Sequence, residues 1–129
     1  SNVIGINGGV QLDLMGQENA ESTGTRQLSG VGGQMDFLEG AYRSKGGKGF
    51  ICINSSRVTK DGERKSNILA TIPGGSTISA PRTMIQYVAT EYGIASLSGK
   101  TLRRGDGLHR APRLPRGADE VRAGEFQVI

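Results

Sequence analysis

A glycine-rich turn that leads directly into a helical pattern constrains the fold of this chain more than any other stretch. Gly30, Gly32 and Gly33 lie close together, and apolar side chains then recur at helical spacing at Phe37, Leu38, Ala41 and Tyr42. The pattern predicts a helix over about residues 35–44, ended by the glycines and lysines that follow. Backbone N–H groups at a helix N-terminus lack partners within the helix, and the helix dipole adds partial positive charge there. The stretch therefore predicts a site for an anion or for a developing oxyanion. A glycine-rich loop without a ligand is the alternative, since the chain holds 21 glycines in 129 residues.

Short apolar runs on both sides of this turn predict strands. The second half of residues 3–14 alternates apolar and polar, which predicts that Gln11 and Asp13 face away from the core. Residues 49–54 form a compact run typical of a strand buried on both faces, with Cys52 inside it. Further strands are predicted over 67–73, 77–80 and 84–90, a hairpin over 57–65 with its tip at Asp61-Gly62, and a turn or short helix over 94–97. Strands with one helix indicate an α/β or α+β layer structure.

The overall properties of the chain narrow the class of protein. Its length predicts one domain, and 35% hydrophobic residues predict a lean core. No apolar run has the length of a membrane helix, no signal-like segment opens the chain, and its single cysteine allows no internal disulfide, so we expect a cytoplasmic protein that does not bind membranes. The net charge is +4, but the basic residues are spread along the chain, mixed with acidic residues and accompanied by few aromatic ones. This arrangement argues against nucleic acid as a partner.

Several motifs fail on closer inspection. Residues 98–101 read Ser-Gly-Lys-Thr like the end of a P-loop, but Ile94 stands where the first glycine belongs. The glycine turn lacks the last small residue of a dinucleotide fingerprint, because Met35 occupies that position. His109 is the lone histidine and lies in an Arg/Gly/Pro-rich tail, residues 103–129, whose composition predicts irregular structure. We therefore expect no metal site.

Glu91 is the carboxylate whose position draws attention. It ends a predicted strand beside Gly93, in a segment without other charges back to Arg82. A carboxylate at a strand end can act as an acid, a base or a ligand contact. From the local sequence alone, a surface or capping role is favoured.

Three motifs in this order together resemble one family. Residues 7–19 (INGGVQLDLMGQEN from Ile6), 29–37 (SGVGGQMDF) and 90–103 (TEYGIASLSGKTLR) are similar to the carboxy-terminal part of the acetyl-CoA hydrolase/transferase family, which includes acetate, butyrate and 4-hydroxybutyrate CoA-transferases. The resemblance covers about residues 3–103. It implies an α/β, CoA-transferase-like mixed sheet with flanking helices, in which residues 1–102 form part of the C-terminal domain and that domain is incomplete.

The resemblance also implies a chemistry and a set of site residues. Members work by a ping-pong reaction in which a glutamate attacks an acyl-CoA thioester and becomes a glutamyl-CoA thioester, before a carboxylate acceptor or water completes the cycle. The substrates are an acyl-CoA and a small carboxylate, with no covalently bound cofactor. The family's glycine-loop role in contacting CoA falls on Gly30, Gly32, Gly33 and Gln34, with the Gly33 amide nearest the thioester. The second active-site carboxylate falls on Glu91, which reverses the local interpretation of that residue.

The chain departs from the family pattern in ways that limit what it can do alone. The nucleophilic glutamate belongs upstream of residue 1, so we expect a fragment that does not turn over. Gln11 stands where members usually have Glu, Glu18 stands where many have Val, and the amphipathic helix that usually follows Leu102 is missing. Two alternatives stay open. One is a non-catalytic module that holds CoA or another phosphate ligand with Lys45, Lys48 and Arg57; the other is a domain that self-associates as a homo-oligomer through an exposed domain interface.

Overall fold

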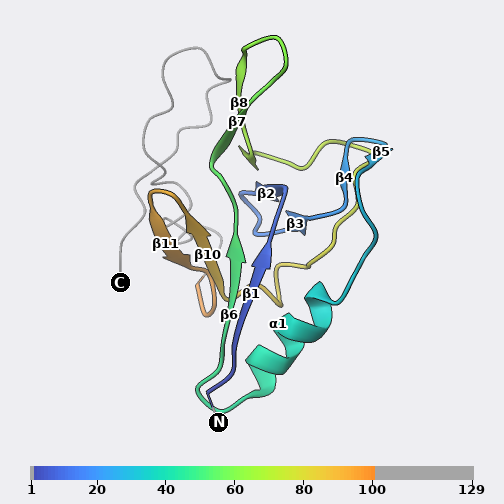
Figure 1. Ribbon diagram of the computed structural model, residues 1–129. Coiled ribbons are helices and arrows are strands. Elements are labelled where there is room, and N and C mark those ends of the chain that lie inside the picture. Colours follow the sequence, from blue (N-terminus) through green and yellow to red (C-terminus); the bar gives the residue numbers. More distant parts are fainter. Residues whose placement is uncertain (1, 101–129) are drawn as a thin grey trace.

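A four-stranded mixed sheet forms the centre of the computed structural model, which describes residues 2–100 (Figure 1). Three of its strands run parallel and are adjacent in the order β1, β6, β10. The fourth, β11, is antiparallel to β10 and closes a hairpin with it. The four strands span Ile4–Gly8 (β1), Lys48–Cys52 (β6), Tyr87–Thr90 (β10) and Gly93–Ser96 (β11). The carboxyl ends of β1, β6 and β10 therefore meet at one edge of the sheet.

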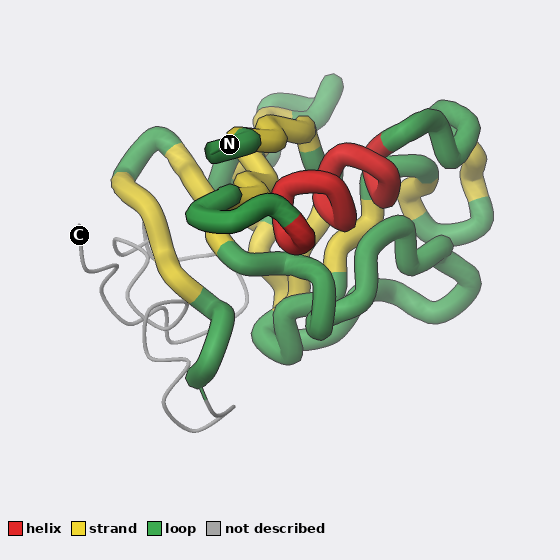
Figure 2. Tube along the Cα trace, turned by 90° about the horizontal axis from the view of Figure 1, so that it is seen from below, coloured by secondary structure: helices red, strands yellow, loops and turns green. Residues whose placement is uncertain are grey.

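Helix α1, Gln34–Arg43, links β1 to β6 and covers one face of the sheet (Figure 2). It packs closely because glycines lie beneath it: a Cβ built on Gly5 would lie 3.0 Å from the Phe37 carbonyl oxygen, and one on Gly49 would lie 3.1 Å from Leu38 Cδ2. The predicted helix is confirmed within one residue at each end. The predicted apolar stripe is partly wrong, because Leu38 and Ala41 are buried whereas Phe37 and Tyr42 are exposed.

Three smaller sheets extend from the carboxyl edge of the main sheet. One has the order β3-β2-β9, and the other two are hairpins, β4-β5 and β7-β8. The β7-β8 hairpin confirms the one predicted over 57–65, with Gly62 at positive φ in its turn. These strands span Gln11–Asp13 (β2), Glu18–Asn19 (β3), Ser22–Thr23 (β4), Arg26–Gln27 (β5), Ser56–Val58 (β7), Arg64–Ser66 (β8) and Ile68–Leu69 (β9).

The core lies between the main sheet, α1 and the β3-β2-β9 sheet. Its buried apolar side chains come from every part of the described chain, so no single segment can form it alone. They are Leu12, Leu38, Ile51, Ile53, Ala80, Ile85 and Val88. None of the helical structure in residues 2–100 is long and apolar enough to span a bilayer.

Several strand predictions need correction. Residues 94–97, predicted as a turn or short helix, belong mostly to β11, because pairing with β10 supplies the backbone partners that the local sequence does not show. Residues 77–80, predicted as a strand, contribute only an isolated bridge between Ala80 and Glu18. The predicted strand over 67–73 shortens to β9.

Burial was also mispredicted in β2 and β6. Gln11 and Asp13 are buried, and each is hydrogen-bonded: Gln11 Oε1 accepts from Asn19 Nδ2 at 3.3 Å, and Asp13 Oδ1 accepts from the Met15 and Gln17 N–H groups at 2.9 and 2.8 Å. Strand β6 alternates between exposed and buried residues instead of being buried on both faces, and Cys52 is exposed. Local hydrophobicity could not show this, because it depends on whether anything covers the second face.

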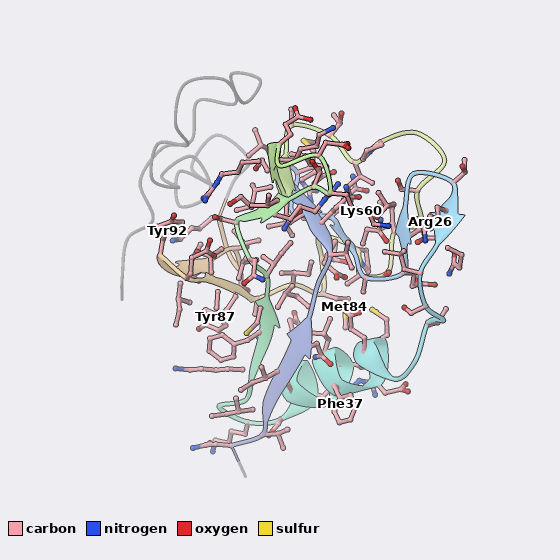
Figure 3. The ribbon with its side chains drawn as sticks, turned by 45° about the horizontal axis from the view of Figure 1, so that its top comes forward. Arg26, Phe37, Lys60, Met84, Tyr87 and Tyr92 are labelled. Atoms are coloured by element: carbon pink, nitrogen blue, oxygen red, sulfur yellow. The ribbon has the colours of Figure 1, made fainter. Side chains whose placement is uncertain are left out.

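Within residues 2–100, that second face is open and largely apolar. The strand register places Ile6, Phe50 and Tyr87 side by side on it, and the Phe50 and Tyr87 rings stack with centroids 4.9 Å apart. Ile4 and Ile6 are both strongly exposed. In the view of Figure 3, Tyr87 and the helix residue Phe37 lie on either side of β1 and β6. Parallel sheets are usually covered on both faces, whereas this surface, the open sheet face, has no cover within residues 2–100. The predicted tail, 103–129, with His109, lies outside the described residues.

Candidate active site

The glycine turn and α1 meet at the carboxyl edge of the parallel strands. The helix runs opposite to β1 and β6, so its C-terminal half lies over the beginnings of the strands, where a Cβ built on Gly47 or Gly49 would lie against Ala41. Its N-terminus therefore points to the edge where the strands end. Sites of α/β proteins commonly lie at this edge, where loops leave the strands.

Residues 30–32 form an exposed turn that leads into the N-cap of α1. Gly32 has φ +59°, a conformation that disfavours residues with a Cβ. A Cβ built on Gly30 or Gly32 would meet nothing within 4 Å, so the backbone there can be approached closely. Gly33 is the N-cap of α1, and no side chain caps this N-terminus. The N–H groups of the first helical turn are thus left for another partner.

Acidic side chains near this turn influence which partner suits it. Asp36 lies in the first turn of α1, with Oδ2 3.8 Å from the position of a Cβ built on Gly33. Its negative charge already interacts favourably with the helix dipole. A phosphate would add a second negative charge beside it, whereas a carbonyl oxygen would bring no full charge in the ground state. The turn therefore suits a carbonyl group better than a phosphate.

Glu18 lies beneath the glycine turn and was not among the predicted site residues. It is 0% exposed, and its Oε2 accepts a hydrogen bond from Gln34 Nε2 at 2.9 Å. Its other oxygen, Oε1, has no hydrogen-bond partner among the described residues. A Cβ built on Gly9 would lie 2.8 Å from Oε1, so glycine at position 9 makes room for the carboxyl group. The pKa of Glu18 is raised to about 7, chiefly because burial disfavours the charged form. The hydrogen bond from Gln34 lowers the pKa, and the nearby Glu21 carboxylate raises it further.

The sequence offered one signal for Glu18, which was its departure from the valine that many family members have there. Its burial could not be predicted, because the groups that enclose it lie far away in the chain. The Glu18 N–H donates to the Ala80 carbonyl at 3.0 Å, and the Glu18 carbonyl accepts from the Ser79 N–H at 2.8 Å.

Glu91 follows β10 at the same edge of the sheet and is held by Ser55. Glu91 Oε2 accepts from the Ser55 N–H at 2.9 Å, and Oε1 accepts from the Ser55 hydroxyl at 2.6 Å. Partial burial acts to raise the pKa of Glu91, but these hydrogen bonds outweigh it and leave the pKa below its usual value. Glu91 is therefore a carboxylate at neutral pH and is suited to accept hydrogen bonds.

The structure gathers the predicted site residues into two groups. Gly30, Gly32, Gly33 and Gln34 form one group with Glu18, beside the end of β1. Glu91 forms the other with Ser55, after the end of β10. Strand β6 lies between them, so the groups stand about two strand spacings apart, on the order of 10 Å. No hydrogen bond between the two groups occurs within residues 2–100, and a substrate would have to bridge them.

The cations considered for a phosphate-binding module do not gather at the glycine turn. Lys45 follows the C-terminus of α1, at the opposite end of the helix. Lys48 begins β6 and lies 5.9 Å from the centroid of the Tyr87 ring. Arg57 donates to Asn67 Oδ1 at 2.7 Å.

Comparison with known proteins gives a consistent result. The family description "Acetyl-CoA hydrolase/transferase C-terminal domain" matches residues 1–106. The chain is 48% identical over 98 residues to the butyryl-CoA:acetate CoA-transferase of Anaerostipes caccae, which covers 76% of this chain and 22% of that protein. It is 49% identical over 102 residues to the 4-hydroxybutyrate coenzyme A transferase of Clostridium kluyveri, covering 79% of this chain and 23% of that protein. The chain thus spans about a fifth of the length of these curated relatives.

Solved structures agree with the sequence comparison. RipA from Yersinia pestis superposes with a TM-score of 0.64 at 38% identity, over 76% of this chain and 21% of that one. The 4-hydroxybutyrate CoA-transferase from Porphyromonas gingivalis gives a TM-score of 0.54 at 36% identity, over 79% of this chain and 20% of that one. The predicted CoA-transferase-like α/β fold is confirmed, with one helix in the described part of the chain.

Proposed function

Because the chain belongs to the acetyl-CoA hydrolase/transferase C-terminal domain family, we propose that it forms one wall of the active site of an acyl-CoA:carboxylate CoA-transferase or acetyl-CoA hydrolase. The substrates are an acyl-CoA and a small carboxylate, or water in a hydrolase. The observation that carries the proposal is the uncapped N-terminus of α1 behind an open glycine turn. Preorganised backbone N–H groups in such a place stabilise the negative charge that develops on a thioester carbonyl oxygen.

The glycine turn supplies the oxyanion contact in this proposal. The N–H group of Gly33, with its neighbours Gly32 and Gln34, donates to the thioester oxygen as the carbonyl carbon becomes tetrahedral. Gly30 and Gly32 leave room for the acyl-CoA to reach the backbone. The nearby carboxylate of Asp36 favours this use of the turn over phosphate binding.

The nucleophile comes from another part of the full-length enzyme. Two carboxyl groups near the turn are already enclosed or engaged: Glu18 is fully buried, and Glu21 accepts a hydrogen bond from the Ser79 hydroxyl at 2.7 Å. In the proposed sequence, an external glutamate attacks the thioester carbon and forms an acyl-glutamyl anhydride, and the CoA thiolate leaves. The thiolate then attacks the glutamyl carbonyl, which forms the glutamyl-CoA thioester and releases the acyl group as its carboxylate. The acceptor carboxylate then attacks the glutamyl-CoA thioester and expels the CoA thiolate, which attacks the acceptor carbonyl of the new anhydride, so that a new acyl-CoA forms and the glutamate carboxylate is released. In a hydrolase, water attacks the glutamyl-CoA thioester instead, which releases free CoA and the glutamate carboxylate.

Glu91 acts in this scheme as an ionised second carboxylate. Its hydrogen bonds from Ser55 keep it deprotonated and fix its position at the edge of the sheet. In this role Glu91 accepts hydrogen bonds from the substrate or from groups beside the nucleophile, and it does not donate a proton.

The Gly30→Ala substitution tests the glycine turn without disturbing the fold. Gly30 does not have a positive φ, and its added Cβ meets nothing within 4 Å, so stability should stay within about 0.5 kcal/mol. The methyl group would occupy the path of the ligand, and we expect acetyl-CoA binding at least about tenfold weaker by calorimetric titration. Gly74→Ala is the matched control, because position 74 is equally open and lies outside the turn.

The same titration separates the proposal from its alternative. ATP bound as tightly as acetyl-CoA would favour a non-catalytic phosphate-binding module, as would CoA binding that G30A leaves unchanged. Turnover of acetyl-CoA by these 129 residues alone would show that the nucleophile lies within them.

We further propose that the open sheet face is covered by other parts of a full-length enzyme and that the isolated chain self-associates through it. Ile6 is 68% exposed at the edge of this face. Ile6→Lys should shift light scattering toward the monomer at concentrations where the parent chain associates, because it places a charge in the apolar contact. Val58→Lys is the control, since Val58 is 62% exposed but lies on the β7-β8 hairpin. An equal effect of both substitutions would rule out the sheet face as the contact.

A further inference from the structure

The glycine turn is held at both ends by one short segment, residues 18–21. Before the turn, the N–H groups of Leu28 and Ser29 donate to the Glu21 carbonyl oxygen, at 2.6 and 3.1 Å. After the turn, Gln34 Nε2 donates to Glu18 Oε2 at 2.9 Å. Between these two anchors, a Cβ built on Gly30 or Gly32 would meet nothing within 4 Å. The anchors therefore set the position of the turn.

The segment that provides the anchors is itself fixed. Glu18 pairs with Leu12 of β2 and forms a bridge with Ala80, so its backbone is bonded on both sides. Asn19 Oδ1 accepts from the N–H groups of Glu21 and Ser22, both at 3.0 Å, which closes the turn that carries Glu21. A rigid base beneath the glycine turn can hold it in one geometry.

We propose that Glu18 is a positioning residue for the glycine turn. Its carboxyl group holds the side chain of Gln34, the first residue of α1, so that the N–H groups of the turn face the thioester carbonyl. The ligand in this statement rests on the proposed function, whereas the mechanical link between Glu18 and the turn does not. Glu18 touches neither the ligand nor the reacting atoms in this scheme; it acts through Gln34.

The burial of Glu18 supports a functional reason for its presence. A buried carboxyl group with one unpartnered oxygen costs stability, and an apolar side chain would remove that cost. Residues that break a local packing rule without structural benefit tend to mark functional sites. The anchoring bond also survives a change of protonation, because Oε2 can accept from Gln34 whether or not Oε1 carries a proton.

Three variants of the 129-residue chain test the link by NMR order parameters of the turn. Glu18→Val removes the acceptor, Glu18→Gln keeps an acceptor oxygen, and Glu21→Gln changes the neighbouring carboxyl without touching either anchor, because Glu21 anchors through its backbone. We expect the order parameters of Gly32 and Gly33 to fall from about 0.85 to below about 0.6 in E18V and to stay near the parent value in E18Q and E21Q.

A merely structural role predicts a different pattern. It would loosen the strands of the main sheet together with the turn and lower the stability of E18V. The positioning role predicts that E18V is at least as stable as the parent at pH 8, while the turn alone becomes mobile. Gln34→Ala breaks the same hydrogen bond from the helix side and should give the same loss of order, so the test does not depend on the folding of E18V.

Acetyl-CoA titration of the same variants distinguishes this proposal from the proposed function. Loss of turn order together with about tenfold weaker binding in E18V supports both. If turn order is lost but neither the parent chain nor any variant binds acetyl-CoA, the positioning role is supported and acetyl-CoA as the ligand is contradicted. Unchanged order parameters in E18V and Q34A overturn the positioning role whatever the affinity.

Discussion

Leu38→Ala should destabilise the chain by roughly 2–5 kcal/mol, a large fraction of the total stability of a domain of this size. Leu38 is 0% exposed and sits between α1 and the glycine of β6, where Gly49 allows the helix to approach the strand. Truncation would leave a cavity where α1 packs on β6. Urea unfolding monitored by circular dichroism measures the effect, with the m-value as a check on two-state behaviour.

Phe37→Ala is the matched control for this substitution. Phe37 is the preceding residue in the same helix but is 63% exposed, so its loss should cost less than about 1 kcal/mol. The sequence pattern put both residues in one apolar stripe, and only the structure separates them. Equal destabilisation by the two variants would contradict the packing of α1 described above.

The largest pH effect is expected from Glu18, and it is a loss of stability as the pH rises. The folded state raises the pKa of Glu18 from 4.5 to about 7, so the folded protein binds the proton more tightly than the unfolded chain does. The contribution of Glu18 is therefore most favourable below pH 4.5 and is lost as the pH rises through about 7. At about 1.4 kcal/mol per pKa unit, the loss amounts to about 3 kcal/mol.

Glu18→Gln should remove this pH dependence. The amide cannot ionise but keeps an oxygen that can accept from Gln34. Unfolding free energies of E18Q and the parent chain, measured in urea between pH 4.5 and 8, should diverge by about 3 kcal/mol in favour of E18Q as the pH rises. Glu63→Gln is the control, because Glu63 is an exposed residue of the β7-β8 hairpin region. Parallel curves for E18Q and the parent chain would show that the buried carboxyl group does not titrate as described.

Local signals predicted the helix, the glycine turn and the charged hairpin well. The helix follows from side-chain periodicity and from glycines at both ends, which are properties of neighbouring residues. The turn at Asp61-Gly62 follows from the conformational freedom of glycine. The family resemblance rested on three motifs of this kind, and the comparisons confirm it.

What the sequence could not predict depends on residues far apart in the chain. Strand β11 forms because β10 lies beside it, and no periodicity within 94–97 indicates that. Cys52 is exposed because nothing described covers its face of the sheet, although its neighbours are apolar. Glu18 is buried because Ala80 and Gln34, both distant in sequence, close over it. The glycines of the site could therefore be predicted from the sequence, whereas the residues that support them are visible only in the structure.

The contact between Gly9 and Glu18 links two positions whose substitutions should be inherited together. Oε1 of Glu18 occupies the space that any larger side chain at position 9 would need. Glutamate at 18 favours glycine at 9, whereas a shorter side chain at 18 would leave Ile51 Cγ2, 3.1 Å from the position of a Cβ built on Gly9, as the remaining close neighbour of an alanine there. Covariation between positions 9 and 18 across many homologous chains would be the evolutionary trace of a carboxyl group enclosed beneath the glycine turn.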